Sequence, residues 1–293
     1  MIVVILAVLK AGGAYVALDP NNPSERNNFI IKETNAQVVV TIDRYKLNFE
    51  QQGLVLMDGD MQSIKRCSIN NPFGHQRDLT TTDVVLQFAN YTFDASVLEI
   101  FPALTSGARL ALAEKDKLLT DLELCIRMMD ITSMFLTISN ILPQNTPSVT
   151  KVMVGAEMIT TALLKTWAHM VALYNFYGPA EVAVMFMANP IVNEEISCSN
   201  IGKPIGCNSI YILDEDLHPV PLGVYGELCV SGPQLARGYL NQPDLTTQAF
   251  EKSTVYSGKR LYRIGDLAWF NASGVDWSQR QSNQTEWLEN RVG

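Results

Sequence analysis

The chain has 293 residues and a formal net charge of −8, with 47% hydrophobic and 18% charged residues. This length allows one large domain or two ordinary ones with a sizeable core, and the composition is that of a globular chain. No Lys/Arg stripe is present, which excludes the usual footprint of nucleic-acid binding. The longest apolar stretch at the start is too short to span a bilayer. We therefore expect a cytoplasmic protein with neither a nucleic-acid nor a membrane partner.

The cysteines and histidines point to no metal site. The five cysteines are scattered without CxxC spacing, and the three histidines are far apart in the sequence. Reduced thiols in the core of a cytosolic chain are the simplest interpretation. No pattern of zinc ligands is formed.

The first part of the chain predicts a helix at 2–11, a second helix over 26–35 opened by Pro23 and Ser24, and a short strand at 38–42. Residues 44–82 show little periodicity and are expected to be irregular, which is long for a connection within a compact domain.

Strands and helices then alternate, which favours a parallel sheet flanked by helices. The expected strands are 84–90, 108–113, 133–138, 151–157 and 171–179, and the expected helices are 95–107, 119–129 and 162–170. After about residue 200, short β runs alternate with Asp, Pro and Gly turns, which is typical of antiparallel β structure. We therefore expect an α/β region over 1–200 and a smaller β-rich region over 201–277.

Three expected strands end in unusual residues. Asp94 follows the first, the turn Gly155-Ala156-Glu157 ends the second, and Tyr-Gly-Pro-Ala-Glu (177–181) ends the third. Ligands of open parallel sheets bind beyond the carboxyl ends of the strands. Taken singly, Asp94 can be a helix N-cap, Gly155 a plain turn and Glu181 a solvated charge. Together they predict one site for a ligand with an amine and a metal-bound phosphate.

Five ordered segments carry a resemblance to a known family. They are LKAGGAYVALDP (9–20), FDASVLEIF (93–101), NFYGPAE (175–181), GELCVSGPQLARGYL (226–240) and YRIGDL (262–267). The chain resembles the amino-acid adenylation domain of non-ribosomal peptide synthetases, within the adenylate-forming (AMP-binding) superfamily. The resemblance covers nearly the whole chain but only part of that domain. It implies an incomplete large α/β domain with a small β-rich subdomain, without the C-terminal lid.

The family joins a carboxylate to ATP, forming an acyl-adenylate and pyrophosphate, and passes the acyl group to a carrier-protein thiol. Neutralising the charge of the transferring phosphate is the main task of such a site. The resemblance implies ATP and Mg²⁺, with Glu181 as the Mg²⁺ ligand and Asp94 holding the substrate's α-amino group. Asp266 would accept hydrogen bonds from the ribose hydroxyls, although it can also be a simple turn carboxylate after Gly265. Tyr177 and the 155–157 turn would flank the adenine.

The implied site residues form two larger sets. The nucleotide-binding set is Gly155, Ala156, Glu157, Asn175, Tyr177, Gly178, Asp266 and Arg280. The substrate side-chain pocket is Asp94, Ala95, Leu98, Phe135, Val152, Val154, Phe176, Val184 and Met185. Apart from Asp94 the pocket is apolar, so an apolar or aromatic amino acid is expected. These apolar residues can equally be ordinary core.

The chain departs from the family pattern at several points. Ala180 and Ile264 each replace a threonine, and Ala180 cannot make the hydroxyl contact to phosphate. The Gly/Ser/Thr-rich phosphate loop, which would offer backbone N–H groups to the phosphates, is not found between 41 and 93. The junction of an internal deletion is expected near 70–72. Residues 278–293 resemble a degenerate hinge that keeps Arg280, and neither a lid nor a phosphopantetheine attachment site follows.

Three interpretations remain open from the sequence. The first is an active amino-acid adenylating enzyme, disfavoured by the missing loop and lid. The second is a non-catalytic remnant that binds an amino acid or a nucleotide. The third is a truncated or mis-spliced gene model whose real protein is a full synthetase. The expected activity of this stretch alone is therefore impaired or absent.

Overall fold

The computed structural model describes residues 1–42, 44–45, 49, 54–56, 79–112, 128–132, 142–191, 197–253, 255–256 and 258–278. The helices are α1 (Ile2–Lys10), α2 (Ser24–Glu33), α3 (Ala95–Ser106), α6 (Thr161–Trp167) and α7 (Pro243–Ala249), with 3₁₀ turns at Pro143–Asn145 and Ala180–Val182. The strands are β1 (Val39–Thr41), β2 (Leu54–Leu56), β3 (Val84–Gln87), β4 (Arg109–Leu112), β5 (Met128–Thr132), β6 (Lys151–Gly155), β7 (Ala172–Tyr177), β8 (Met187–Ile191), β9 (Asn200–Pro204), β10 (Ser209–Leu213), β11 (Gly226–Ser231), β12 (Phe250–Lys252), β13 (Arg260–Phe270) and β14 (Val275–Ser278).

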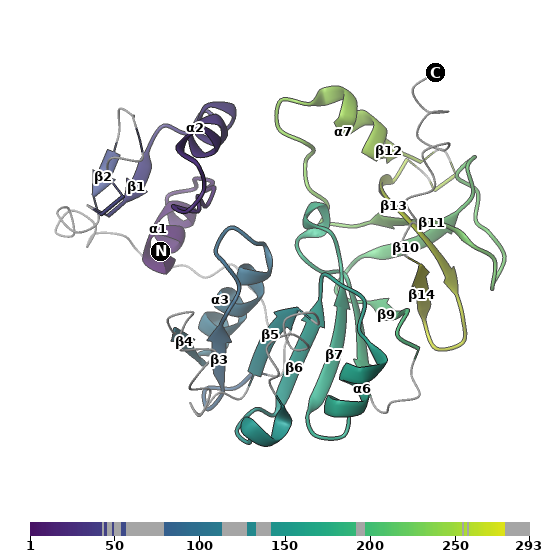
Figure 1. The fold of residues 1–293 in the computed structure, drawn as a ribbon. Helices are drawn as coiled ribbons and strands as arrows, with labels where there is room; N and C mark the ends of the chain where they lie inside the picture. The colour runs from purple at the N-terminus through teal and green to yellow at the C-terminus, as the bar shows by residue number, and fades with distance from the viewer. Residues whose placement is uncertain are drawn as a thin grey trace.

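One twelve-stranded sheet forms the centre of the described structure (Figure 1). Its order is β10-β11-β13-β14-β9-β8-β7-β6-β5-β3-β4, with β12 paired to β13. Strands β3 to β7 pair in parallel, so their carboxyl ends meet at one edge. The expected α/β fold with a parallel sheet flanked by helices is confirmed.

Helices cover both faces of the parallel strands. On one face, Met153 and Val85 pack with Ala103 of α3. On the other face, Val152 and Val154 pack with Trp167 of α6. Strands buried on both sides are apolar at every position, which is why this part of the sequence shows no period-2 alternation.

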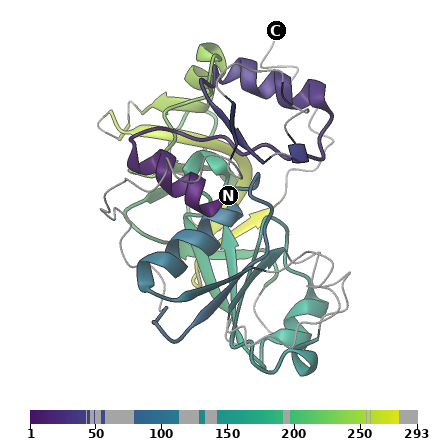
Figure 2. The same cartoon turned by 90° about the vertical axis from the view of Figure 1, so that its left-hand side faces the viewer.

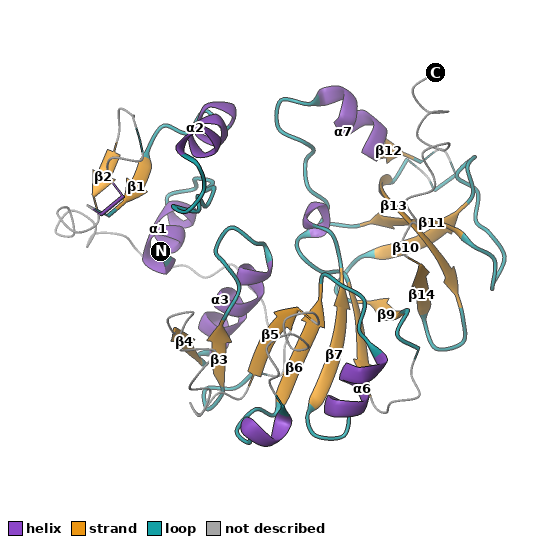
Figure 3. Ribbon diagram, viewed as in Figure 1, coloured by secondary structure: helices purple, strands orange, loops and turns teal. Residues whose placement is uncertain are grey.

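The sheet changes direction at β8, which pairs antiparallel with β7 and with β9. Strand β9 pairs antiparallel with β14 on its other side and so joins the parallel strands to the C-terminal ones. Beyond β8, the described elements are strands apart from α7 (Figure 3). The change of rhythm near residue 200 is therefore a change of strand direction within one continuous sheet.

The N-terminal segment packs beside α3 (Figure 2). Ile5 of α1 is 2% exposed and contacts Ile100 and Phe101 of α3. Strand β2 lies inside the 44–82 region expected to be irregular, and it pairs in parallel with β1. Most of that region lies outside the described residues. Within the described residues, no helix is long and apolar enough to cross a membrane.

One expected helix is only partly described. The sequence predicted a helix at 119–129, but its last two residues, Met128 and Met129, begin β5, which pairs with β6 from Met128↔Lys151 to Thr132↔Gly155. Residues 119–127 lie outside the described residues. The strand expected at 133–138 lies outside the described residues.

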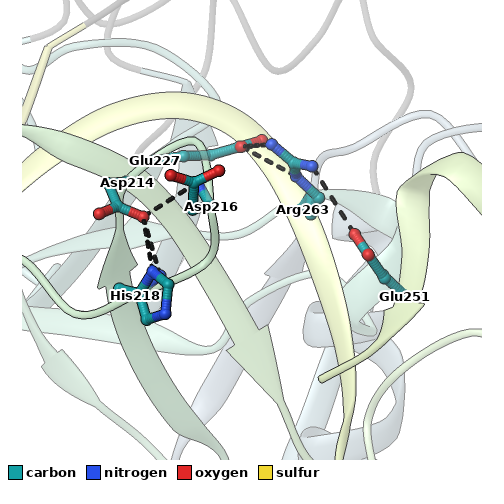
Figure 4. Close-up of polar contacts among 6 residues, drawn as sticks. All are labelled: Asp214, Asp216, His218, Glu227, Glu251 and Arg263. Carbon is teal, nitrogen blue, oxygen red and sulfur yellow. Dashed lines mark hydrogen bonds and ion pairs between the residues drawn. The ribbon is translucent and has the colours of Figure 1, made fainter. Parts of the chain in front are cut away.

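A buried ion pair fixes the long strand β13. Arg263 donates from Nε (2.9 Å) and Nη2 (2.5 Å) to Oε2 of Glu227 on β11, and its Nη1 lies 3.7 Å from Glu251 on β12 (Figure 4). Beside them, Asp214 accepts backbone N–H bonds within a surface turn, including one from His218 at 2.8 Å. These contacts thus link strands β11, β12 and β13 near the part of β13 that approaches the candidate site.

Candidate nucleotide and substrate site

Two predicted nucleotide-binding residues from distant motifs meet at the end of β7. The Tyr177 hydroxyl donates a 2.5 Å hydrogen bond to Oδ2 of Asp266 on β13. The Tyr177 ring packs against Phe186 and Trp277 with centroid distances of 5.9 and 5.6 Å. Burial, followed by the Asp266 carboxylate, raises the pKa of Tyr177, so the hydroxyl stays a donor. Among the described residues Oδ1 of Asp266 has no hydrogen-bond partner, so it can accept from a ligand.

The predicted metal ligand Glu181 lies in the 3₁₀ turn that follows β7. Its Oε1 accepts a 2.8 Å hydrogen bond from the hydroxyl of Tyr239, which lies 3.4 Å from the hydroxyl of Tyr262. Burial first, then its contact with Tyr239 and the charge of Glu181, raises the pKa of Tyr262. The carboxylate is therefore surrounded by neutral hydroxyl donors that fix its orientation.

Asp94 lies close enough to Glu181 for the two charges to interact. Burial is the largest cause of the raised pKa of Asp94, and the Glu181 carboxylate raises it further. Asp94 occupies the N-cap position of α3, but its side chain makes no capping hydrogen bond. The N-cap contact, one of the two alternatives that the sequence left open for Asp94, is therefore not made. The backbone N–H groups of Asp94 and Ala95 bond the half-buried carboxyl and lower its pKa, and its remaining lone pairs can face a cationic group.

The predicted pocket residues divide between the two faces of the sheet. Phe176 packs with Met153 in the cluster beneath α3, the helix that also carries Ala95 and Leu98. Val152 and Val154 are 0% and 1% exposed in the cluster beneath α6. The structure does not bring these two valines together with the others, because alternate positions of β6 point to opposite faces. They are core residues of the α6 face.

The remaining pocket residues Val184 and Met185 lie in a strained turn. The backbone N–H of Met185 bonds the carbonyl of Ala183, closing a γ-turn around Val184, whose φ is +75°. Ala183 also has positive φ (+52°). Such angles are unusual for non-glycine residues and most unusual for a β-branched one. Backbone strain of this kind collects at ligand sites.

Asn175 has a structural partner instead of facing a ligand. It is 4% exposed and donates through Nδ2 to the backbone carbonyl of Asn200 (3.1 Å), which also accepts from Asn189 (3.0 Å). These bonds tie β7 and β8 to β9. Asn175 therefore holds the sheet together beneath Tyr177.

The 155–157 turn lies directly against the backbone of β7. A Cβ on Gly155 would lie 2.9 Å from the carbonyl oxygen of Phe176, and Ala156 has φ +65°. Glu157 is exposed. The predicted residues Phe135 and Arg280 lie outside the described residues.

Sequence reasoning missed a carboxylate that supports the Asp94 loop. Glu99 of α3 is fully buried and accepts hydrogen bonds from the backbone N–H groups of Phe88 (3.1 Å) and Ala89 (3.0 Å) and from Nε2 of Gln87 (3.1 Å). It thereby fixes the end of β3, from which the chain leads to Asp94. The available signal was a charged residue inside the apolar face of the 95–103 helix.

The donor set suits magnesium held together with a nucleotide. In the described part of the chain, no group of three His, Cys, Asp or Glu side chains can hold a metal ion. Mg²⁺ in phosphoryl-transfer sites uses one or two carboxylates and substrate phosphates. Glu181 is a carboxylate of this kind, and the residues therefore fit Mg²⁺ delivered with ATP.

Comparison with known proteins identifies the family of the chain. The sequence profile of the family described as "AMP-binding enzyme" matches residues 60–240. The chain is 33% identical to nonribosomal peptide synthetase sidE of Aspergillus fumigatus, over all of this chain and 16% of the relative, and 32% identical to bacitracin synthase 3 of Bacillus licheniformis, over 98% of this chain and 5% of the relative. The chain thus spans only a small part of these relatives.

The fold is also found among solved structures. The N-terminal subdomain of Klebsiella oxytoca NpsA, solved in complex with 3-hydroxybenzoyl-AMSN, matches with a TM-score of 0.80 at 20% identity, covering 94% of this chain and 83% of that one. The family match over more than half of the sequence, with 33% identity to sidE over the whole chain, shows that the chain belongs to the AMP-binding enzyme family.

Proposed function

We propose that the chain binds ATP and an amino acid at the carboxyl ends of its parallel strands, as part of amino-acid activation for non-ribosomal peptide synthesis. The observation that carries this proposal is the hydrogen bond between Tyr177 and Asp266, which joins two motifs of the family in one place. Glu181 and Asp94 lie at the same edge of the sheet. The similarity to peptide synthetases supports the reaction class.

Each of these side chains has a task in that reaction. Asp94 pairs with the α-ammonium group of the amino acid, which aims its carboxylate at the nucleotide. Asp266 accepts hydrogen bonds from the ribose, and the Tyr177 ring lies along the adenine. A carboxylate oxygen of the substrate then bonds to the α-phosphorus while the bond to the β-phosphate oxygen breaks and pyrophosphate leaves. Mg²⁺ held at Glu181 supplies neutralisation of phosphate charge.

The substrate side chain is proposed to be apolar or aromatic. Ala95, Leu98 and Phe176 are partly buried on the α3 side, and Val184 and Met185 follow the Tyr177 turn. Burying an apolar side chain against such residues contributes about 1.5–3 kcal/mol. Val152 and Val154 take no part in this revised pocket, because they pack beneath α6.

We further propose that adenylation by these residues alone is slow or absent. No phosphate loop of the family type occurs between 41 and 93, and Ala180, beside Glu181, has no hydroxyl to offer. The alignment with sidE extends over 339 positions, more than the 293 residues of this chain, so the relative has residues without a counterpart here. Transfer to a carrier protein and a cytoplasmic location stay predictions.

The test is amino-acid-dependent exchange of labelled pyrophosphate into ATP, combined with calorimetric titration of AMP. We expect AMP to bind and exchange to stay at background across a panel of apolar and aromatic amino acids. Exchange above background would overturn the proposed loss of activity. Absence of AMP binding by folded protein would overturn the proposed nucleotide site.

A second candidate is that this sequence is a mis-spliced gene model whose real protein is a full synthetase, favoured by the abrupt loss of the loop between recognisable flanking segments. Sequencing the transcript across Asn70–Pro72 tests it. A transcript that encodes the loop at this point supports the second candidate, whereas an uninterrupted match to the present sequence excludes it.

A further inference from the structure

We propose that Tyr239 is a positioning residue for Glu181, holding its carboxylate in the orientation that a nucleotide-bound metal ion requires. This inference rests on the proposed function, because it takes Glu181 as the metal ligand. The Tyr239 hydroxyl donates to Oε1 of Glu181 at 2.8 Å, although 58 residues separate the two. A carboxylate with one oxygen fixed by a donor presents its remaining lone pairs in a defined direction.

A second contact joins the segment around Tyr239 to the residue that it orients. The backbone N–H of Ala236 donates to the backbone carbonyl of Glu181 at 2.7 Å, three residues before Tyr239 in the chain. The segment 236–239 therefore bonds both the main-chain carbonyl and the side-chain carboxylate of Glu181. A short 3₁₀ turn such as 180–182 has little rigidity of its own, so these two contacts determine where its carboxylate points.

Tyr239 is itself held in place by three neighbours. Its backbone N–H donates to Oγ1 of Thr246 on α7 at 2.8 Å, and its ring meets Phe250 edge-on at 5.8 Å. Arg260 donates from Nη1 to the carbonyl of Ala236 (2.6 Å) and from Nη2 to the carbonyl of Arg237 (2.7 Å). The guanidinium also stacks over Phe250 at 4.3 Å. The fork of Arg260 thus fixes the segment that carries Tyr239.

The direction of the hydrogen-bond chain favours a donor role. The Tyr239 hydroxyl donates its hydrogen bond to Glu181, so its hydrogen is not available to Tyr262. The Tyr262 hydroxyl, 3.4 Å away, therefore donates to the oxygen of Tyr239. The orientation of the Glu181 carboxylate is therefore fixed by a hydroxyl donor.

The test compares ATP binding with Mg²⁺ and with EDTA for wild-type protein, Tyr239→Phe and the control Tyr225→Phe. Tyr225 is 56% exposed, and its ring is tilted against that of Trp269 with a centroid distance of 4.5 Å. We expect Tyr239→Phe to weaken binding of Mg²⁺·ATP by about 10–100-fold, the usual effect of losing a group that orients a metal ligand. Binding of ATP in EDTA should not change, and Tyr225→Phe should behave as wild type.

Unchanged Mg²⁺·ATP binding by Tyr239→Phe, or an equal loss in Mg²⁺ and in EDTA, overturns the inference while leaving the proposed function standing. If the wild-type protein binds ATP equally well with and without Mg²⁺, the metal role of Glu181 fails, and this inference fails with it.

A metal-free measurement tests the contact itself. Thermal unfolding of Tyr239→Phe, Glu181→Gln and the double variant should show shifts in Tm that do not add, because both single changes alter one hydrogen bond. Additive shifts would mean that the two side chains do not interact, and would overturn the inference whatever the nucleotide results.

Discussion

The hydroxyl of Tyr177 and the carboxylate of Asp266 are joined by a hydrogen bond across 89 residues of sequence. Tyr177 ends the parallel strand β7, and Asp266 lies in the long antiparallel strand β13. The bond therefore spans the place where the two halves of the sheet meet. A ligand that contacts both residues therefore binds across the junction between the two halves of the sheet.

Removal of the Tyr177 hydroxyl should lower both stability and nucleotide affinity. Tyr177→Phe keeps the ring contacts with Phe186 and Trp277 but leaves the partly buried Asp266 without its donor. An unsatisfied charged acceptor costs about 1–3 kcal/mol in the free energy of unfolding. Urea denaturation measures this loss, and calorimetry measures AMP binding.

Asp266→Asn separates the two effects. The amide oxygen can still accept from Tyr177, so we expect a smaller loss of stability, whereas the charged acceptor for ribose hydroxyls is gone and AMP affinity should fall about tenfold. An Asp266→Asn protein that binds AMP like wild type would contradict the assignment of Asp266 to the ribose.

The sequence named these two residues as site candidates, yet it could not predict that they bond to each other. The order of strands β13, β14, β9, β8 and β7 in the sheet brings them together. The same limit explains Val152 and Val154. On a strand buried on both faces every residue is apolar, so the pattern does not tell which valines face α6 and which face α3.

Asn175 and Glu99 have structural partners that the sequence could not predict. Asn175 lies within a family motif, but its amide serves the carbonyl of Asn200 in a neighbouring strand. Glu99 lies in the quoted segment 93–101 without an assigned role, and its partners at 87–89 become visible only when α3 packs over β3. In both cases the partner depends on tertiary contacts that the sequence pattern does not contain.

Loss of the Glu99 carboxylate should destabilise the end of β3. Glu99→Gln retains one acceptor oxygen, but its amide group would face the donating Nε2 of Gln87 and the N–H groups of Phe88 and Ala89. Buried donors left without acceptors cost about 1–3 kcal/mol. Chemical denaturation should therefore show a clear loss relative to the exposed control Glu215→Gln. Equal midpoints for the two variants would contradict this account of Glu99.

Asp94 should make stability fall as pH rises. Folding raises the pKa of Asp94 above its ordinary value of 3.8, chiefly through burial. Between these two pKa values the folded protein holds a proton that the unfolded chain has lost, so the free energy of unfolding decreases with pH in that window. Asp94→Asn cannot ionise and should escape this decrease, so its Tm relative to wild type should improve from acid to neutral pH.

The same change should weaken substrate binding. Without the carboxylate the α-ammonium group of an amino acid loses a charge-assisted partner, worth about 1.5–3 kcal/mol or about 10–100-fold in affinity. A stabilised protein with lost affinity is the expected compromise of a binding residue. If the Tm difference between Asp94→Asn and wild type does not vary with pH, the raised pKa is not a property of the folded protein.

Gly178 should tolerate no side chain, because the strained turn lies directly against it. A Cβ at this position would be 2.5 Å from Cα of Met185 and 2.8 Å from the carbonyl oxygen of Val184. Backbone atoms cannot rotate away, so Gly178→Ala must displace the 183–185 turn, at a cost of about 1–3 kcal/mol for overpacking. Val184 and Met185 would move with it, and amino-acid affinity should fall together with stability.

Gly223→Ala is the matched control for this last change. A Cβ there meets nothing within 4 Å, but the residue has φ +78°, so the substitution should cost stability through backbone strain alone. Its amino-acid affinity should equal that of wild type. Denaturation and ligand titration of both variants therefore separate general destabilisation from displacement of the turn. If Gly178→Ala loses stability but binds amino acid normally, the 183–185 turn does not line the substrate pocket.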